Sequence, residues 1–180
     1  MSEQTTLSLS QFQQKKNIVE RQQFLRFVLL PDTNLMVSLS EIAAVLKIPF
    51  GQIIPIPEMP SWVMGVYNWR GEIVWMIDLG QLLGFTPWYQ QSGVASHHKA
   101  VVIHPSTQDR KNRTAGDLVG LVVSDVNDIE LCNTNELHSP PASAVTPDLA
   151  PFLRGYWIKD NGDIVVTIDA DAIFAAMPKE

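Results

Sequence analysis

A β-hairpin followed by a short helical segment occurs twice in this chain, and the repeat restricts its possible folds more than any other feature. The first copy lies in residues 61–84, where two β-rich runs flank a turn and precede a leucine-rich segment. Near the C-terminus the pattern returns: Gly162-Asp163-Ile164-Val165 matches Gly71-Glu72-Ile73-Val74, and Asp169 matches Asp78. Such a repeat predicts two structurally related halves.

The two aspartates occupy the same place in both copies, after an apolar strand and before a helical segment. Aspartate is a favoured N-cap residue because its carboxylate accepts hydrogen bonds from the free N–H groups of the first helical turn. Gln81 stands in capping-box position after Asp78. We therefore interpret Asp78 and Asp169 as helix caps rather than as a catalytic carboxylate pair.

The other segments are predicted as short strands joined by turns and by irregular connections rich in Pro, Ser and Thr. The predicted strands are residues 24–29, 35–39, 64–69, 73–77, 99–104, 118–126, 155–159 and 164–168, with an edge strand near 53–56. Short helices are predicted at 41–46, 79–83 and 169–177. Ile73, Trp75 and Ile77 are predicted to form an inward face. The predicted fold class is mainly β, with two small, mostly antiparallel β-barrels and a few short helices.

Composition and charge exclude several classes of function. The formal net charge of −6 and the pI near 5.1 argue against nucleic-acid binding, which needs a basic surface. The single Cys132 fits a reducing compartment. Neither a signal peptide nor a long apolar run is present, so we expect a cytoplasmic protein without membrane insertion. Residues 1–21 are expected to be a flexible polar tail, and residues 22–180 one domain of two intertwined subdomains.

The run from Gly65 to Gly84 carries a specific motif. Its letters, GVYNWRGEIVWMIDLGQLLG, resemble the signature G-V-x-N-L-R-G-x-x-x-P-V-x-D-L-x-x-x-L-G of the CheW family of chemotaxis coupling proteins. The resemblance extends over residues 23–177 and includes the opening FLRFVL strand, the IPEMP segment and the closing GDIVVTID segment. It implies two intertwined, five-stranded SH3-like barrels.

The resemblance also implies a function. Family members are non-catalytic adaptors that use no cofactor and couple chemoreceptors to a histidine kinase. The implied partners are the regulatory domain of a CheA-like kinase and the helical hairpin tip of a methyl-accepting chemoreceptor. Two positions depart from the family pattern, because Trp69 replaces a usual Leu and Trp75 replaces a usual Pro. These departures suggest a subfamily, and a link to type IV pilus motility is one expectation.

Five residues are candidates for partner contact. Arg70 corresponds to the arginine of the family's N-x-R-G motif, which the family uses in receptor coupling, and an exposed guanidinium suits carboxylates or carbonyls. Trp69 beside it is a candidate anchor, and Asn68 is a turn determinant that belongs to the same tip. Gly65 either admits a close backbone approach or forms a structural bulge. Ile42 aligns with an aliphatic helix position that contacts receptors in the family.

Two alternatives to the adaptor function remain open. The first is a small β-barrel enzyme or ligand-binding domain that uses His104, Asp125 and Asp128. The second is a regulatory module that pairs with a kinase or scaffold without receptor contact. His97, His98 and His104 are interpreted as solvated loop residues, not metal ligands, because no Cys or Glu recurs at ligand spacing.

Overall fold

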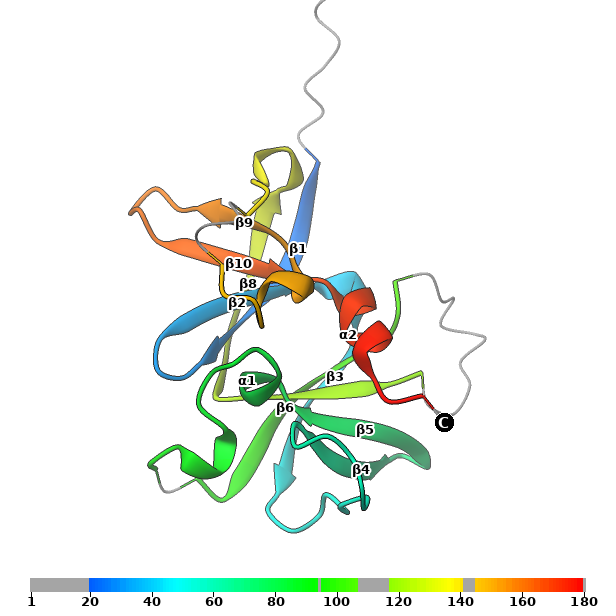
Figure 1. The fold of residues 1–180 in the computed structure, drawn as a ribbon. Coiled ribbons are helices and arrows are strands. Elements are labelled where there is room, and N and C mark those ends of the chain that lie inside the picture. The colour runs from blue at the N-terminus through cyan, green and yellow to red at the C-terminus, as the bar shows by residue number, and fades with distance from the viewer. Residues whose placement is uncertain (1–19, 94, 107–116, 141–144, 180) are drawn as a thin grey trace, which may run out of the picture.

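The computed structural model describes residues 20–93, 95–106, 117–140 and 145–179 (Figure 1). Its strands are β1 (Arg21–Leu29), β2 (Thr33–Ser38), β3 (Ile42–Pro49), β4 (Val63–Trp69), β5 (Glu72–Asp78), β6 (His97–Ile103), β7 (Val119–Val123), β8 (Asp125–Asn133), β9 (Leu153–Ile158) and β10 (Ile164–Ile168). Its α-helices are α1 (Leu79–Leu82) and α2 (Ala170–Ala176), and its 3-10 turns are η2 (Leu39–Glu41), η3 (Trp88–Gln90), η4 (Thr134–Glu136) and η5 (Ala150–Phe152). Apart from residues 20 and 21, the predicted tail lies outside the described residues.

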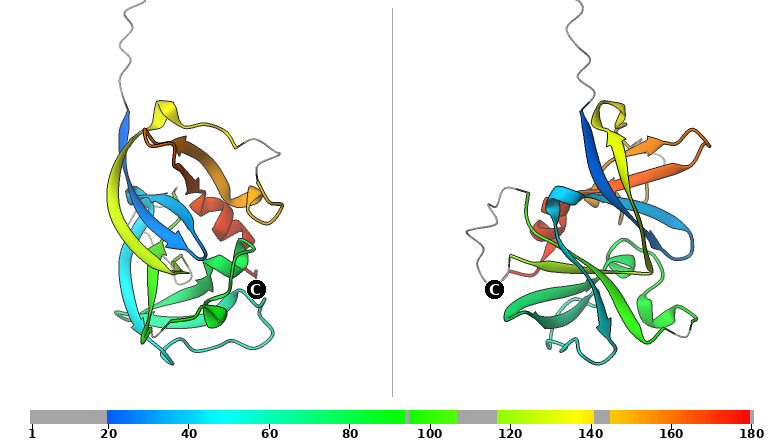
Figure 2. Two further views of the ribbon diagram at one scale, coloured as in Figure 1. Left: turned by 90° about the vertical axis from the view of Figure 1, so that its left-hand side faces the viewer. Right: turned by 180° about the vertical axis from the view of Figure 1, so that it is seen from behind.

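The described strands form two five-stranded sheets. The upper sheet of Figure 1 has the order β8-β1-β2-β10-β9, and the lower sheet has the order β3-β6-β7-β5-β4. Each sheet curls into a barrel-like half, as the further views in Figure 2 show. This architecture confirms the predicted mainly β fold with two five-stranded barrels and few helices.

The sequence repeat corresponds to an exchange of strands between the two sheets. The unit from β1 to α1 places its first hairpin in the upper sheet and its other three strands in the lower sheet. The unit from β6 to α2 does the reverse. In each sheet the last strand of one unit pairs in parallel with the hairpin of the other, β10 with β2 and β5 with β7. The two halves are therefore intertwined through the main chain.

Among the described residues, three apolar clusters hold this arrangement together. The largest one lies between the sheets and receives side chains from both, including Phe27, Leu35, Ile77, Leu121 and Ile168, all at most 1% exposed. Helices α1 and α2 also pack against this shared core. The lower sheet encloses a smaller cluster of its own, and the upper sheet encloses another. Burial of these side chains from water is the main stabilising contribution.

One glycine in each repeat allows the main chain to cross its hairpin. Ile54 forms an isolated β-bridge with Val66, next to Gly65, and His138 forms the equivalent bridge next to Gly155. A Cβ atom at Gly65 would lie 2.0 Å from the carbonyl oxygen of Ile54, and one at Gly155 would lie 2.7 Å from that of His138. Both sites therefore require glycine, because a backbone segment occupies the space of a side chain.

The predicted helix at residues 41–46 is wrong. Residues 39–41 form the turn η2, and Ile42 begins strand β3, which pairs with β6. The spacing of Ile42, Val45 and Leu46 fits a helix, yet Val45 is 49% exposed. The effective pattern is the alternation of Ala44, Leu46 and Ile48, which pack on the core of the lower barrel. Ladder pairing with β6 overrides the local helical spacing.

The predicted strand at residues 118–126 is two strands, which lie in different sheets. The chain crosses at Ser124, whose backbone N–H donates to Val28 O (3.0 Å) and whose Oγ accepts from Leu30 N (3.0 Å). Strand β8 was not predicted because its pattern is inverted. Two of its aliphatic side chains, Ile129 and Leu131, are more than half exposed. The partly buried Glu130 lies between them and pairs with cations of β1 and of the turn after β9.

Two further predictions from residue patterns fail in part. Of the predicted inward face, Ile77 belongs to the shared core and Trp75 packs against it, but Ile73 is 44% exposed. Val74 and Met76, on the other face of β5, are fully buried in the lower barrel. His98 and His104 are buried and not solvated, although the adjacent His97 is exposed, as alternation along a strand requires. The expected caps are correct: Asp78 accepts from Gln81 N, and Asp169 accepts from the first N–H groups of α2.

Candidate partner-binding site

The tip of the β4–β5 hairpin is the candidate partner-binding site. Trp69 and Glu72 are the last cross-strand pair, so Arg70 and Gly71 alone form the connection. Both have positive φ, 54° and 86°. Two-residue turns of the I′ type need this conformation at both positions and match the twist of the strands. The exposed arginine is therefore held at the outermost point of a tight, well-defined turn.

Neighbouring side chains fix the tip further. Asn68 Oδ1 accepts a hydrogen bond from Gly71 N at 2.9 Å, which closes the turn locally. The Arg70 guanidinium carbon lies 5.6 Å from the centre of the Trp69 ring, within the range of a cation–π contact. Trp69 itself is half-buried and packs against the core of the lower barrel. A rigid indole thus supports a cation whose donors remain available to a partner.

The equivalent tip of the β9–β10 hairpin has different chemistry. Its turn contains Asp160, Asn161 and Gly162, and Asn161 bonds internally to Asp163. Gly162 again has a positive φ of 86°, but Asn161 before it lacks the positive φ of Arg70, and the connection between the paired Ile158 and Ile164 is longer. The two tips share a glycine of this conformation but neither the turn type nor the charge. Only the first combines an arginine with a supporting tryptophan.

Exposed apolar side chains lie on and beside the hairpin that carries Arg70, and the sequence pattern did not predict their exposure. Ile73 faces solvent directly opposite Asn68 in the hairpin. Ile54, which bridges to β4, is 63% exposed. Ile73 looked like a core residue because its alternation with Trp75 and Ile77 suggested one buried face. Only the exposure found in the folded chain reveals it as a surface residue.

The structure places two of the predicted site residues away from the tip's exposed surface. At Gly65 the main chain of Ile54 fills the space that a side chain would occupy, so this residue presents no side chain to a partner. Ile42 is 9% exposed at the start of β3, where it pairs with Ile103 and belongs to the shared core. Strands β3 and β4 are at opposite ends of the lower sheet's order. Asn68, Trp69 and Arg70 are thus the predicted residues that the fold brings together, and contact of any of the five with a partner stays a prediction.

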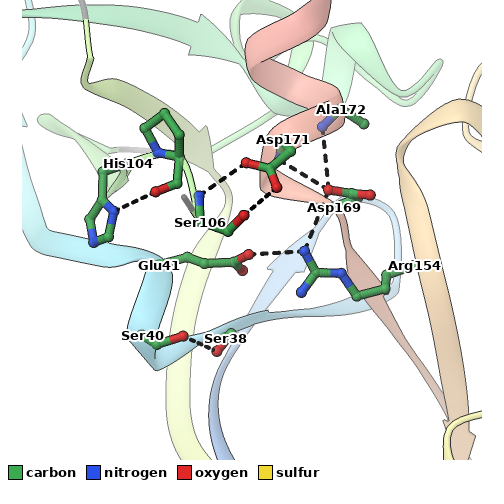
Figure 3. Close-up of polar contacts among 10 residues, drawn as sticks. Ser38, Ser40, Glu41, His104, Ser106, Arg154, Asp169, Asp171 and Ala172 are labelled. Carbon is green, nitrogen blue, oxygen red and sulfur yellow. Dashed lines mark hydrogen bonds and ion pairs between the residues drawn. The ribbon is translucent and has the colours of Figure 1, made fainter. Parts of the chain in front are cut away.

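A partly buried polar cluster joins the segments around α2 (Figure 3). Arg154 Nη2 contacts Glu41 Oε1 at 2.9 Å and Asp169 Oδ1 at 3.4 Å. Ser106 donates from its backbone and its hydroxyl to Asp171. Burial raises the pKa of Glu41, and Arg154 opposes this effect. Hydrogen bonds from Ser106 lower the pKa of Asp171. The geometry is that of a structural ion-pair network.

The alternative catalytic or ligand-binding set is not assembled. His104 follows the C-terminal end of β6, where its Nδ1 lies 3.0 Å from Pro105 O. Asp125 pairs with Lys99 near the other end of that strand. Lys99 and His104 are five residues apart in extended chain, which places their backbones about 17 Å from each other. Within the described ranges, no three His, Cys, Asp or Glu side chains gather in a group that could hold a metal ion.

The strained conformation of Arg70 leads to a testable prediction about the turn. Asparagine adopts positive φ more readily than arginine, so Arg70→Asn removes a backbone cost of about 1 kcal/mol and loses a surface cation–π contact of about 0.5 kcal/mol. We expect the free energy of unfolding to be unchanged or raised by up to about 1 kcal/mol, measured by urea denaturation. A clear loss of stability would show that Arg70 serves the fold instead of a partner.

Together these features define a class of protein. Two intertwined barrels share one core and present a cation on a rigid hairpin, as expected for a scaffold that acts through its surface. A family model described as CheW-like domain matches residues 23–177. The chain belongs to the CheW family, whose members are non-catalytic adaptors.

Individual proteins agree with this assignment. The probable chemotaxis protein CheW of Rhizobium etli is 29% identical over 124 residues, covering 69% of this chain and 70% of its own length. The chemotaxis protein CheW of Rhizobium meliloti is 25% identical over 131 residues, covering 70% and 72%. The scaffolding protein TtCheW of Thermoanaerobacter tengcongensis has the same fold, with a TM-score of 0.65 and 22% identity over 82% of this chain and 88% of its own. None of the described helices is long and apolar enough to cross a membrane.

Proposed function

We propose that this protein couples a chemoreceptor to a CheA-type histidine kinase in the cytoplasm. The observation that carries the proposal is the hairpin tip, where Arg70 is held at positive φ above Trp69. An arginine in a strained conformation on an exposed turn has a backbone cost that asparagine would avoid, so a role beyond folding is expected. Family membership supplies the two partners.

The receptor partner fits the chemistry of the tip. A receptor tip is a helical hairpin, and its surface offers carboxylates and helix-end carbonyls to the five donors of a guanidinium. Trp69 adds a rigid aromatic surface, and exposed Ile73 adds an apolar one. Aromatic residues and arginine dominate the binding energy of many interfaces. The kinase then binds elsewhere on the barrels, and many weak contacts in an array sum to a stable assembly.

The test is a pair of titrations with a receptor-tip fragment and with the regulatory domain of a CheA-like kinase from the same cell. Arg70→Glu reverses the charge at the centre of the proposed contact, so we expect receptor affinity to fall by about tenfold to a hundredfold while kinase affinity is unchanged. Arg21→Glu is the matched control, because Arg21 is also exposed but lies in the upper sheet.

Each outcome assigns a function. Receptor binding that survives Arg70→Glu contradicts the proposed receptor contact and favours a module that pairs with a kinase without touching a receptor. Absence of kinase binding by the intact protein contradicts the coupling role itself. The names of the relatives refer to chemotaxis, and a link to type IV pili stays a prediction from Trp69 and Trp75.

A further inference from the structure

A cleft of about 540 Å³ lies between the two halves, on a different part of the molecule from the Arg70 tip. It is lined by the end of β1, by β6 and β7, and by the connection between α1 and β6. In Figures 1 and 2 this connection and the β4–β5 turn lie at opposite ends of the lower sheet. The volume falls within the range of about 300–1,000 Å³ that is usual for ligand sites.

Aromatic rings form one wall of the cleft. The His98 ring lies 4.5 Å from that of Phe50 and 4.6 Å from that of Trp88, and Tyr89 meets Trp88 edge to face. Burial lowers the pKa of His98, which favours the neutral form of this ring. Tyr89 is 59% exposed and Phe50 is 45% exposed. Such exposed aromatic residues gathered around a cleft are typical of binding surfaces.

The polar groups of this wall are mainly donors. Within the described residues, neither Trp88 Nε1–H nor the Tyr89 hydroxyl has a hydrogen-bond partner, whereas the indole of Trp157 donates to Asn133 O. A proline-rich segment matches such a wall, because its rings pack between aromatic side chains and its backbone offers carbonyl acceptors without N–H donors.

The charges at one end of the cleft favour an anion. Lys47 and Lys99 are directly opposite each other on β3 and β6, so two ammonium groups share one face of the sheet. Asp125 pairs with Lys99 at 2.5 Å, and it also acts on Lys47, which has no ion pair of its own among the described residues. One carboxylate for two facing lysines leaves an excess positive charge, and like charges in this position destabilise a sheet.

We propose that this cleft and the adjoining lysine pair bind a proline-rich, acidic segment of a partner protein. The prolines pack against Tyr89 and Trp88, and carbonyl groups of the segment accept from these two side chains. An acidic residue of the segment completes the charge balance at Lys47 and Lys99. The site is independent of the Arg70 tip, so its test does not depend on the receptor or the kinase.

The experiment is a fluorescence anisotropy titration of the full chain with a labelled peptide of consecutive prolines followed by two glutamates. One control peptide replaces the prolines by alternating glycine and serine, and another replaces the glutamates by lysines. We expect saturable binding of the first peptide only, weakened by added salt because the lysine pair is exposed. Tyr89→Ala and Lys47→Glu should each weaken it at least about tenfold.

Ile164→Ala is the matched protein control, because Ile164 is also 59% exposed but lies in the upper sheet, and it should bind like the parent. Tyr89→Phe, which removes only the hydroxyl, keeps the test valid if Tyr89→Ala unfolds, and it should bind more weakly than the parent. Equal binding of the glycine–serine peptide, or full binding by Lys47→Glu, overturns the proposal. Self-association of the parent that Tyr89→Ala abolishes also overturns it, since a second copy would then occupy the cleft.

Discussion

Gly65→Ala is expected to destabilise the protein by about 3–5 kcal/mol, a large part of the stability of a domain of this size. The added Cβ would lie 2.0 Å from the Ile54 carbonyl oxygen and 2.6 Å from its carbon, and neither backbone atom can move without breaking the bridge to Val66. The φ of 138° at this residue adds strain for any side chain. Urea denaturation measures the loss directly.

Two other glycines provide the comparison. A Cβ at Gly93 would meet nothing within 4 Å, so Gly93→Ala should leave stability within about 0.5 kcal/mol of the parent. Gly155→Ala should be intermediate, because its new Cβ meets the Leu137 side chain as well as the His138 carbonyl. Equal stability of Gly65→Ala and Gly93→Ala would contradict the close approach. A loss of coupling in Gly65→Ala would therefore be explained by its folding defect and would not by itself show that Gly65 contacts a partner.

Arg154→Met is expected to cost about 2–4 kcal/mol near pH 7.5, because it leaves the buried Glu41 carboxylate without its cation. The value is below that for a fully buried pair, since the Arg154 side chain is 36% exposed. Burial already raises the pKa of Glu41, and the variant raises it further because the opposing charge is gone. In the variant, the folded state therefore favours the protonated form of Glu41 more than the unfolded state does.

The sign of the pH dependence follows from this shift. A carboxyl whose pKa is higher in the folded than in the unfolded state contributes stability below its unfolded pKa and loses it as pH rises through the folded pKa. The deficit of Arg154→Met should therefore be large near pH 7.5 and smaller near pH 4.5, in denaturation curves at both values. The double variant Glu41→Gln with Arg154→Met should lose most of this dependence. A deficit that is the same at both values would contradict the assigned role of Glu41.

Much of the site could be read from the sequence because turns and caps are local. The Arg70-Gly71 turn, with Asn68 three residues before Gly71, specifies the hairpin by contacts within a few residues. Asp78 and Asp169 specify helix starts in the same way. The motif around these residues also identified the family. These features needed no knowledge of distant parts of the chain.

The exposed and buried faces could not be read in this way. Ile73 and Ile129 are aliphatic but face solvent, whereas Glu41 and His104 are polar but buried. Residues 41–46 have the spacing of a helix, but residues 42–46 lie in the edge strand β3, because β6 offers ladder hydrogen bonds to them. The two like-charged side chains of Lys47 and Lys99 also face each other only because of the register between β3 and β6.

The sequence by itself determined the hairpin tips, the helix caps and the mainly β character, because each depends on neighbours within a few residues. It also determined the repeat, because the two copies can be matched residue by residue. Tertiary structure alone decided which sheet each strand joins. Strand β3 follows the β1–β2 hairpin but joins the other sheet, and β8 follows the β6–β7 hairpin and also joins the other sheet. That exchange creates a core between the sheets as well as one inside each barrel. A strand such as β5 then has buried neighbours on both faces, so the alternation of its apolar residues no longer shows which side faces solvent.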